Sequence, residues 1–116
     1  MNSIAEAQNE VCQKFGADFL RCDDWLKVGI SRNFDPHRYP INGLRHPPEG
    51  DTTGWYIWSG DRFSQDDDFF VPSHAAHLRD SCPMILKYLG LAPGWRFLLA
   101  PGWEDVWFDA SLLNID

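Results

Sequence analysis

Two histidines and an aspartate stand at a regular three-residue spacing in the second half of the chain. On a helix, His74, His77 and Asp80 would lie on one side, and imidazole and carboxylate groups are common metal ligands. A stable site also needs outer groups that orient those ligands. Histidines on the solvent side of an amphipathic helix account for the same spacing without a metal. We therefore expect the protein to bind no metal and no other cofactor.

The acidic triplet Asp66-Asp67-Asp68 is the second candidate site. A calcium loop of the EF-hand type needs acids at alternate positions, a central glycine and a terminal glutamate, and this segment does not continue that pattern. Three adjacent carboxylates repel one another and stay hydrated, which favours an exposed loop. Such a loop could present negative charge to a basic partner.

Residues suited to catalysis are present, but the neighbouring sequence features that catalysis would need are missing. Ser59 lacks the glycine-flanked turn that exposes a nucleophilic serine, and Cys82 fits a buried structural thiol better than a nucleophile. Asp61 and Glu104 could meet across a sheet as a carboxylate pair. The alternative to a binding protein is therefore a small cytosolic hydrolase built on Asp61, His77 or Glu104. It requires a deep pocket and carboxylates of perturbed pKa. A non-enzymatic adaptor or ligand-binding domain is a third hypothesis, and we expect no enzyme.

The charge of the whole chain points to a protein partner. The 116 residues include 17 acids and 10 bases, and the net charge is −7. Such a field repels nucleic acid and anionic membranes and attracts basic proteins. The basic residues are scattered, and no glycine-rich loop could hold a phosphate group. Acidity that serves solubility alone is the simpler explanation of the same charge.

Cysteine usage and the N-terminal segment predict a cytoplasmic protein. Cys12, Cys22 and Cys82 are odd in number, and no two of them form a C-x-x-C pair, which favours free thiols in a reducing compartment. The segment Met1–Glu6 lacks the basic and apolar parts of a secretion signal. No apolar run is long enough to span a bilayer.

A five-residue phrase occurs twice near the C-terminus, as Leu91–Trp95 and as Leu99–Trp103. In each copy, proline presets the second position of a turn and glycine supplies a positive φ at the third. Strand-forming residues lie between the two turns, and another such run follows the second turn. The pattern predicts an antiparallel β-hairpin of residues 95–99 and 104–108, whose outgoing arm carries acids and no basic residue.

Local signals predict the remaining elements. A capping box at Ser3 and Glu6 begins an amphipathic helix, and Gly16 ends it. Alternating apolar residues predict strands, and many prolines and glycines between them predict a long irregular connection. The expected elements are a helix over 4–15, strands at 25–31 and 54–58, a short edge strand at 41–45, and helices over 72–82 and 83–89.

This order of elements predicts one α+β domain over residues 1–116. We expect an antiparallel sheet with the N-terminal and central helices packed on one face, followed by the C-terminal hairpin. Aromatic residues make up 15% of the chain, including 6 Trp. We place most of them in the core and the others on a binding surface.

Several segments together resemble one bacterial family, the immunity proteins of polymorphic toxin systems. The family is the thirty-third of the numbered immunity families and was first catalogued as a domain of unknown function. The similarity covers about residues 22–113. The segments that carry it are Gly54–Gly60, the acidic stretch 66–70, His77-Leu78, Cys82-Pro83 and Leu89–Leu98.

The resemblance implies a cytosolic protein, made beside a secreted toxin, that binds and blocks that toxin without catalytic residues. We expect it to act by occlusion, with acids steering a basic toxin domain and aromatic side chains anchoring it. Trp103 and Trp107 are the expected anchors, although one of them could instead lie in the core. The expected partner-binding residues are Asp61, Asp66, Asp67, Asp68, Trp103, Glu104, Asp105, Trp107 and Asp109.

Overall fold

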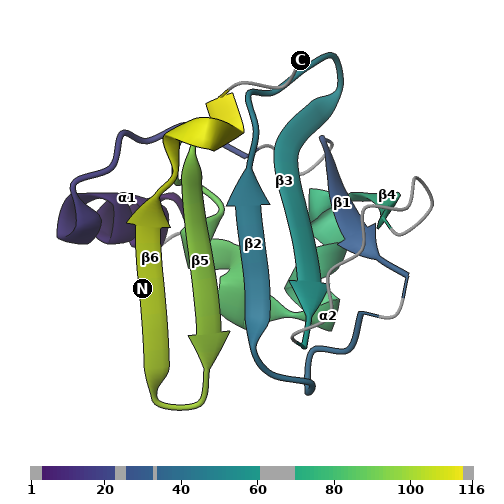
Figure 1. The fold of residues 1–116 in the computed structure, drawn as a ribbon. Helices are drawn as coiled ribbons and strands as arrows, with labels where there is room; N and C mark the ends of the chain where they lie inside the picture. Colours follow the sequence, from purple (N-terminus) through teal and green to yellow (C-terminus); the bar gives the residue numbers. More distant parts are fainter. Residues whose placement is uncertain (1–3, 23–25, 33, 61–69, 114–116) are drawn as a thin grey trace.

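A six-stranded sheet forms the centre of the computed structural model, which describes residues 4–22, 26–32, 34–60 and 70–113 (Figure 1). The elements in chain order are α1 (Ile4–Phe15), β1 (Lys27–Ser31), β2 (Ile41–Arg45), β3 (Thr52–Ser59), β4 (Phe70–His74), η1 (Ala75–His77), α2 (Leu78–Ser81), η2 (Pro83–Tyr88), β5 (Trp95–Ala100), β6 (Trp103–Phe108) and η3 (Ala110–Leu113), where η marks a 3₁₀ helix.

The strands lie in the order β4-β1-β3-β2-β5-β6. Four of the neighbouring pairs are antiparallel, and β1 with β3 is parallel. The predicted α+β class and C-terminal hairpin are confirmed, and the sheet is mixed rather than wholly antiparallel. The parallel pair arises because the chain leaves β1, forms β2 elsewhere in the sheet and returns to β1's side as β3.

The two faces of the sheet are covered very differently. Helices α1, α2 and η2 pack on one face, here called the helix face, where the main apolar core includes Val28, Ile57, Ile85 and Phe97 (Figure 1). The opposite face, here called the open face, has a small cluster of Leu44, Trp58 and Leu112, against which Phe70 packs.

Two local predictions need correction. The strand at 41–45 has the expected bounds, but it lies between β3 and β5 rather than at an edge, because its pairing is decided by strands far away in sequence. The helix expected over 72–82 begins later, because Pro72 and Ser73 belong to β4. Proline is tolerated there since β4 is an edge strand.

The hairpin turns use glycine as predicted. Gly94 has φ 97° and Gly102 has φ 72°, values that residues other than glycine rarely adopt. The Pro101-Gly102 turn joins Ala100 to Trp103, and the strands then pair in register as far as Trp95 and Phe108.

Arg45 is the most buried charged residue in the described part of the chain, with 1% of its surface exposed. Its guanidinium donates to the carbonyls of Leu20, Leu91 and Thr53 at 2.8–2.9 Å, and longer bonds reach two further carbonyls, those of Leu89 at 3.2 Å and Arg21 at 3.5 Å. No described carboxylate pairs with it. Burial lowers the pKa of Arg45 to about 10, so the group stays charged at neutral pH.

None of the helices in the described ranges combines the length and the apolar composition that crossing a membrane would require.

Replacing Arg45 by Met should lower the free energy of unfolding by at least about 3 kcal/mol, because several buried carbonyls lose their donor at once. Urea unfolding followed by tryptophan fluorescence measures the change. Arg38→Met is the control, since Arg38 is exposed and should change stability by less than about 0.5 kcal/mol. Equal stabilities of the two variants would contradict a central role for Arg45.

Candidate functional site

Strand β6 divides its side chains between the two faces of the sheet. Val106 packs against the main core and Glu104 contacts α1, so both lie on the helix face. Successive strand residues point to opposite faces. Trp103, Asp105 and Trp107 therefore share the open face, and the structure brings together these three of the predicted site residues.

The two tryptophans on this face are well placed to contact a partner. Trp103 has 60% of its surface exposed and Trp107 has 38%. The guanidinium carbon of Arg96, on the neighbouring strand β5, lies 5.3 Å from the centre of the Trp107 ring. This cation–π contact holds the ring in place, so it can bind without first losing much side-chain freedom.

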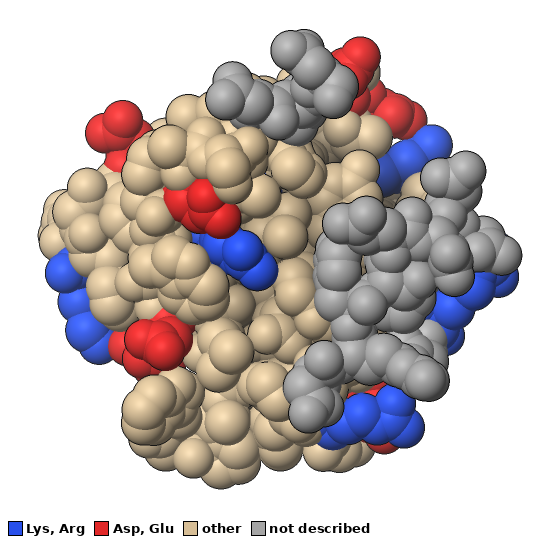
Figure 2. Space-filling view, in the orientation of Figure 1, with Lys and Arg blue, Asp and Glu red and all other residues tan. Residues whose placement is uncertain are grey.

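Charged groups stand singly among the described residues of the open face. Figure 2 shows a surface that is largely uncharged around β5 and β6, with single acidic and basic groups among other side chains. Asp105 is exposed, and no other described side chain pairs with its carboxylate. The open face thus carries two exposed tryptophans and, between them, a carboxylate that no described side chain pairs with.

Glu104 points the other way and is already engaged. Its carboxylate accepts hydrogen bonds from Lys14 of α1, at 2.7 Å, and from the hydroxyl of Tyr88 in η2. These bonds, that of Lys14 foremost, lower the pKa of Glu104 below its ordinary value. Burial, with a smaller effect of the neighbouring carboxylate, raises the pKa of Tyr88. Glu104 thus ties the hairpin to both helices.

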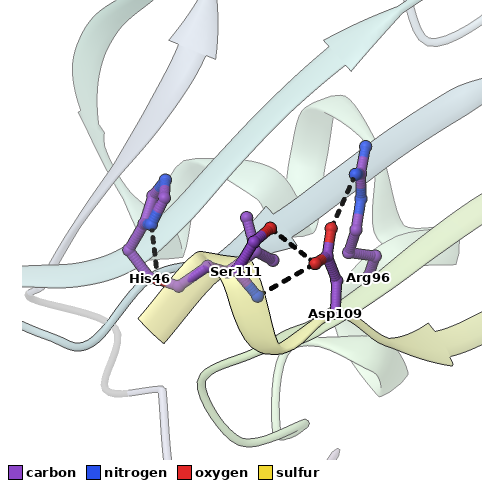
Figure 3. Close-up of polar contacts among 5 residues, drawn as sticks. His46, Arg96, Asp109 and Ser111 are labelled. Carbon is purple, nitrogen blue, oxygen red and sulfur yellow. Dashed lines mark hydrogen bonds and ion pairs between the residues drawn. The ribbon is translucent and has the colours of Figure 1, made fainter. Parts of the chain in front are cut away.

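Asp109 organises the short helix η3. Its carboxylate accepts bonds from the backbone N–H and the hydroxyl of Ser111, at 3.1 and 2.6 Å, and pairs with Arg96 at 3.3 Å (Figure 3). The bonds from Ser111 are the main cause of its lowered pKa. Asp109 therefore acts as a cap for η3, and its charge is largely satisfied within the chain.

A histidine that the sequence analysis did not single out helps to fix η3 over the open face. The carbonyl oxygen of Leu112 lies 2.9 Å from Nδ1 of His46 (Figure 3). A carbonyl only accepts, so Nδ1 carries the proton. The His46 ring also packs edge-on against Tyr56, at 5.5 Å between centroids, and Tyr56 is exposed on the same face.

Four of the predicted binding residues lie outside the described residues: Asp61, Asp66, Asp67 and Asp68. Their part in binding stays a prediction.

The histidines considered as metal ligands lie at the β4 edge. The rings of His74 and His77 are 5.7 Å apart and perpendicular, beside a cleft of about 200 Å³ that Lys27, Pro72 and Ser73 also line. Among the residues with described positions, no three His, Cys, Asp or Glu side chains are grouped as a metal site. Asp80 does not complete one with the two histidines.

Two residues of the hydrolase hypothesis, His77 and Glu104, are far apart, and the third, Asp61, lies outside the described residues. His77 follows β4 and Glu104 lies on β6, at opposite edges of the sheet. Five strand spacings separate the two edges, or roughly 24 Å at about 4.8 Å each. The two groups cannot act on the same bond of a small substrate. Cys82 is buried, and burial raises the pKa of its thiol, so it is a poor nucleophile.

The sequence analysis missed Arg96, Tyr56 and His46 as parts of this surface. Arg96 could have been found, because it alternates with core residues along a predicted strand and must face the other side. His46 gave no such signal, because it comes after the last residue of β2 and strand alternation does not predict where it points. The Asp-x-Ser pattern at Asp109 and Ser111 is a recognisable helix-start signal.

Comparisons with known proteins give one match. A model of the Imm33-like domain family matches residues 7–109, which is most of the chain and includes most of α1, the sheet and the hairpin. The resemblance seen in the sequence is thereby confirmed. Neither the curated proteins nor the solved structures gave a match.

Neighbouring acids on opposite faces of β6 provide a matched stability test. Glu104→Gln should lower the free energy of unfolding by about 1 kcal/mol at pH 7, because the bonds from Lys14 and Tyr88 lose a charged acceptor. Asp105→Asn removes the same charge from an exposed group and should leave stability unchanged.

The effect of Glu104→Gln should depend on pH. A carboxylate whose pKa is lowered by folding stabilises the fold above its unfolded pKa, here about 4.5, and this contribution is lost as pH falls through the folded value. The stability difference between wild type and Glu104→Gln should therefore shrink below pH 4.5, as followed by urea unfolding. A constant difference down to pH 2.5 would show that the charge of Glu104 is irrelevant.

Proposed function

Since the chain belongs to the Imm33-like family, we propose that it is an immunity protein that binds a cognate bacterial toxin and blocks it by occlusion. The observation that supports this most directly is the shared face of Trp103, Asp105 and Trp107, in which two exposed aromatics flank a carboxylate that no described side chain pairs with. We place the protein in the cytoplasm, where its three free cysteines would stay reduced.

The tryptophans would supply most of the binding energy. Large, rigid rings bury much area at little entropic cost, and a few such residues usually dominate an interface. Trp107 is held by Arg96, whereas Trp103 stands next to the hairpin turn and projects further into solvent.

The acids would act mainly on the rate of association. A net charge of −7 attracts a basic toxin over a range of about 8 Å at physiological salt. Asp105 would then pair with a basic group at the contact. We propose that Asp61 and Asp66–Asp68 add to the same field. Glu104 and Asp109 contribute to the field although their carboxylates are bound within the chain.

Binding kinetics with the toxin encoded by the neighbouring gene test this division of roles. Trp103→Ala should speed dissociation at least about tenfold, because an anchor is lost. Asp105→Asn should slow association about two- to threefold, and added salt should slow the wild type. Asp66→Asn with Asp68→Asn tests the acidic stretch in the same assay. Glu104→Gln is the control, because its charge is on the other face, and it should change association less than Asp105→Asn.

Protection of cells is the decisive measurement. Co-expression with the toxin should permit growth for the wild type and should fail for Trp103→Ala combined with Trp107→Ala. An association rate that changes neither with salt nor with the aspartate substitutions would refute electrostatic steering but not inhibition by occlusion. A protein that neither binds the toxin nor protects against it would refute the immunity function.

A further inference from the structure

The two edges of the sheet meet solvent in different ways. The β4 edge contains Pro72, whose nitrogen has no hydrogen to offer an incoming strand. Strand β6 contains no proline, and all of its residues except Val106 are exposed. Proteins commonly block exposed edge strands, because such strands pair readily with other chains. Within the part of the chain that the structure describes, no proline, bulge or paired strand blocks the outer edge of β6.

The unpaired backbone groups of β6 can be assigned from the hairpin register. The turn closes with the pair Ala100 and Trp103, and further along, the N–H of Asp109 donates to the carbonyl of Gly94 at 2.7 Å. The odd-numbered residues between these points therefore direct their N–H and C=O groups toward β5. Those of Glu104, Val106 and Phe108 face outward, and no described backbone group pairs with them.

We infer that β6 binds an extended strand of the toxin, which joins the sheet edge as an additional antiparallel strand. This inference rests on the proposed immunity function and specifies how the partner is held. Three outward donors and three outward acceptors, spread over about 14 Å, would anchor the strand through its backbone. Such backbone bonds contribute affinity with little demand on the partner's sequence, and side-chain contacts set the register.

Side chains on the open face specify which strand fits. Residues directly opposite one another in an antiparallel pair point to the same face and make contact. The added strand would thus present side chains to Trp103, Asp105 and Trp107 in turn. An apolar residue, a Lys or Arg two residues later and another apolar residue two residues after that would match this surface.

Charge favours a basic partner over a second copy of this chain. Two copies joined at β6 would bring two net charges of −7 together and would place acids along both paired strands. A basic toxin strand would instead neutralise Asp105, the acid on this edge that no described side chain pairs with. The lysine on Glu104 also removes a charge that would otherwise discourage strand pairing at the edge.

A proline tests the backbone contact directly. Val106→Pro removes an outward N–H without touching the bonds to β5, and Val106→Ala is the matched control that loses the side chain but keeps the N–H. Against the toxin encoded by the neighbouring gene, Val106→Pro should weaken binding at least about tenfold, and Val106→Ala less than about threefold. Circular dichroism and thermal unfolding establish that both variants fold.

Hydrogen exchange on the wild type gives a second readout that needs no variant. The amides of Glu104, Val106 and Phe108 should exchange quickly in the free protein and slowly in the complex, while those of Asp105 and Trp107 are slow in both. A complex in which the three outward amides still exchange quickly would overturn strand addition and leave occlusion standing. Absence of any complex would overturn the proposed function itself. A dimer that Val106→Pro dissociates would assign the edge to a second copy and overturn the inference.

Discussion

The placement of one cation governs the packing of this fold. Arg45 carries its charge into the interior without a described carboxylate, and backbone carbonyls from three separate parts of the chain share the guanidinium hydrogens. A guanidinium suits this task because its donors lie in a rigid plane. Residues 16–22 and 89–94 lie outside the named helices and strands, and this group holds both against the sheet. The carbonyl of Leu89 also receives the indole N–H of Trp55, so the aromatic core and the cation share an acceptor.

The packing around Arg45 supports the β5–β6 hairpin at the edge of the sheet. Strand β5 pairs with β2, which carries Arg45, and β6 pairs only with β5. The hairpin is then held a second time by Glu104, whose contacts reach α1 and η2. One face of β6 makes the structural contacts, and the other face carries Trp103, Asp105 and Trp107. A rigid scaffold of this kind lowers the entropic cost of binding.

The elements that depend on interactions between neighbouring residues could be predicted from local sequence signals. The first helix spans 4–15 as expected because its apolar spacing and Gly16 are local signals, and the Pro-Gly turns predicted the hairpin for the same reason. The predicted cap, Ser3, lies outside the described residues. The central position of β2 and the parallel pairing of β1 depend on distant strands and were not predictable. The sequence analysis counted Arg45 only among the scattered bases. Arg45 stands four residues after Ile41 on the same strand, and this spacing predicts that both side chains point to the same buried face. At the site, strand alternation alone places Trp103, Asp105 and Trp107 together, but the partners of Glu104 come from two helices that no local pattern connects to it.

The position of β2 in the sheet bears on synthesis. Strand β2 leaves the ribosome well before β5, its partner on one side, and before Leu89 and Leu91, which supply carbonyls to Arg45. At about 5–20 residues per second, the nascent chain spends several seconds with its central strand half-paired and its interior cation unmet. That interval is when a chaperone would be needed and when aggregation is most favourable. Under the proposed immunity function, protection by a newly made copy would begin only after the last strands of the sheet had been translated and paired.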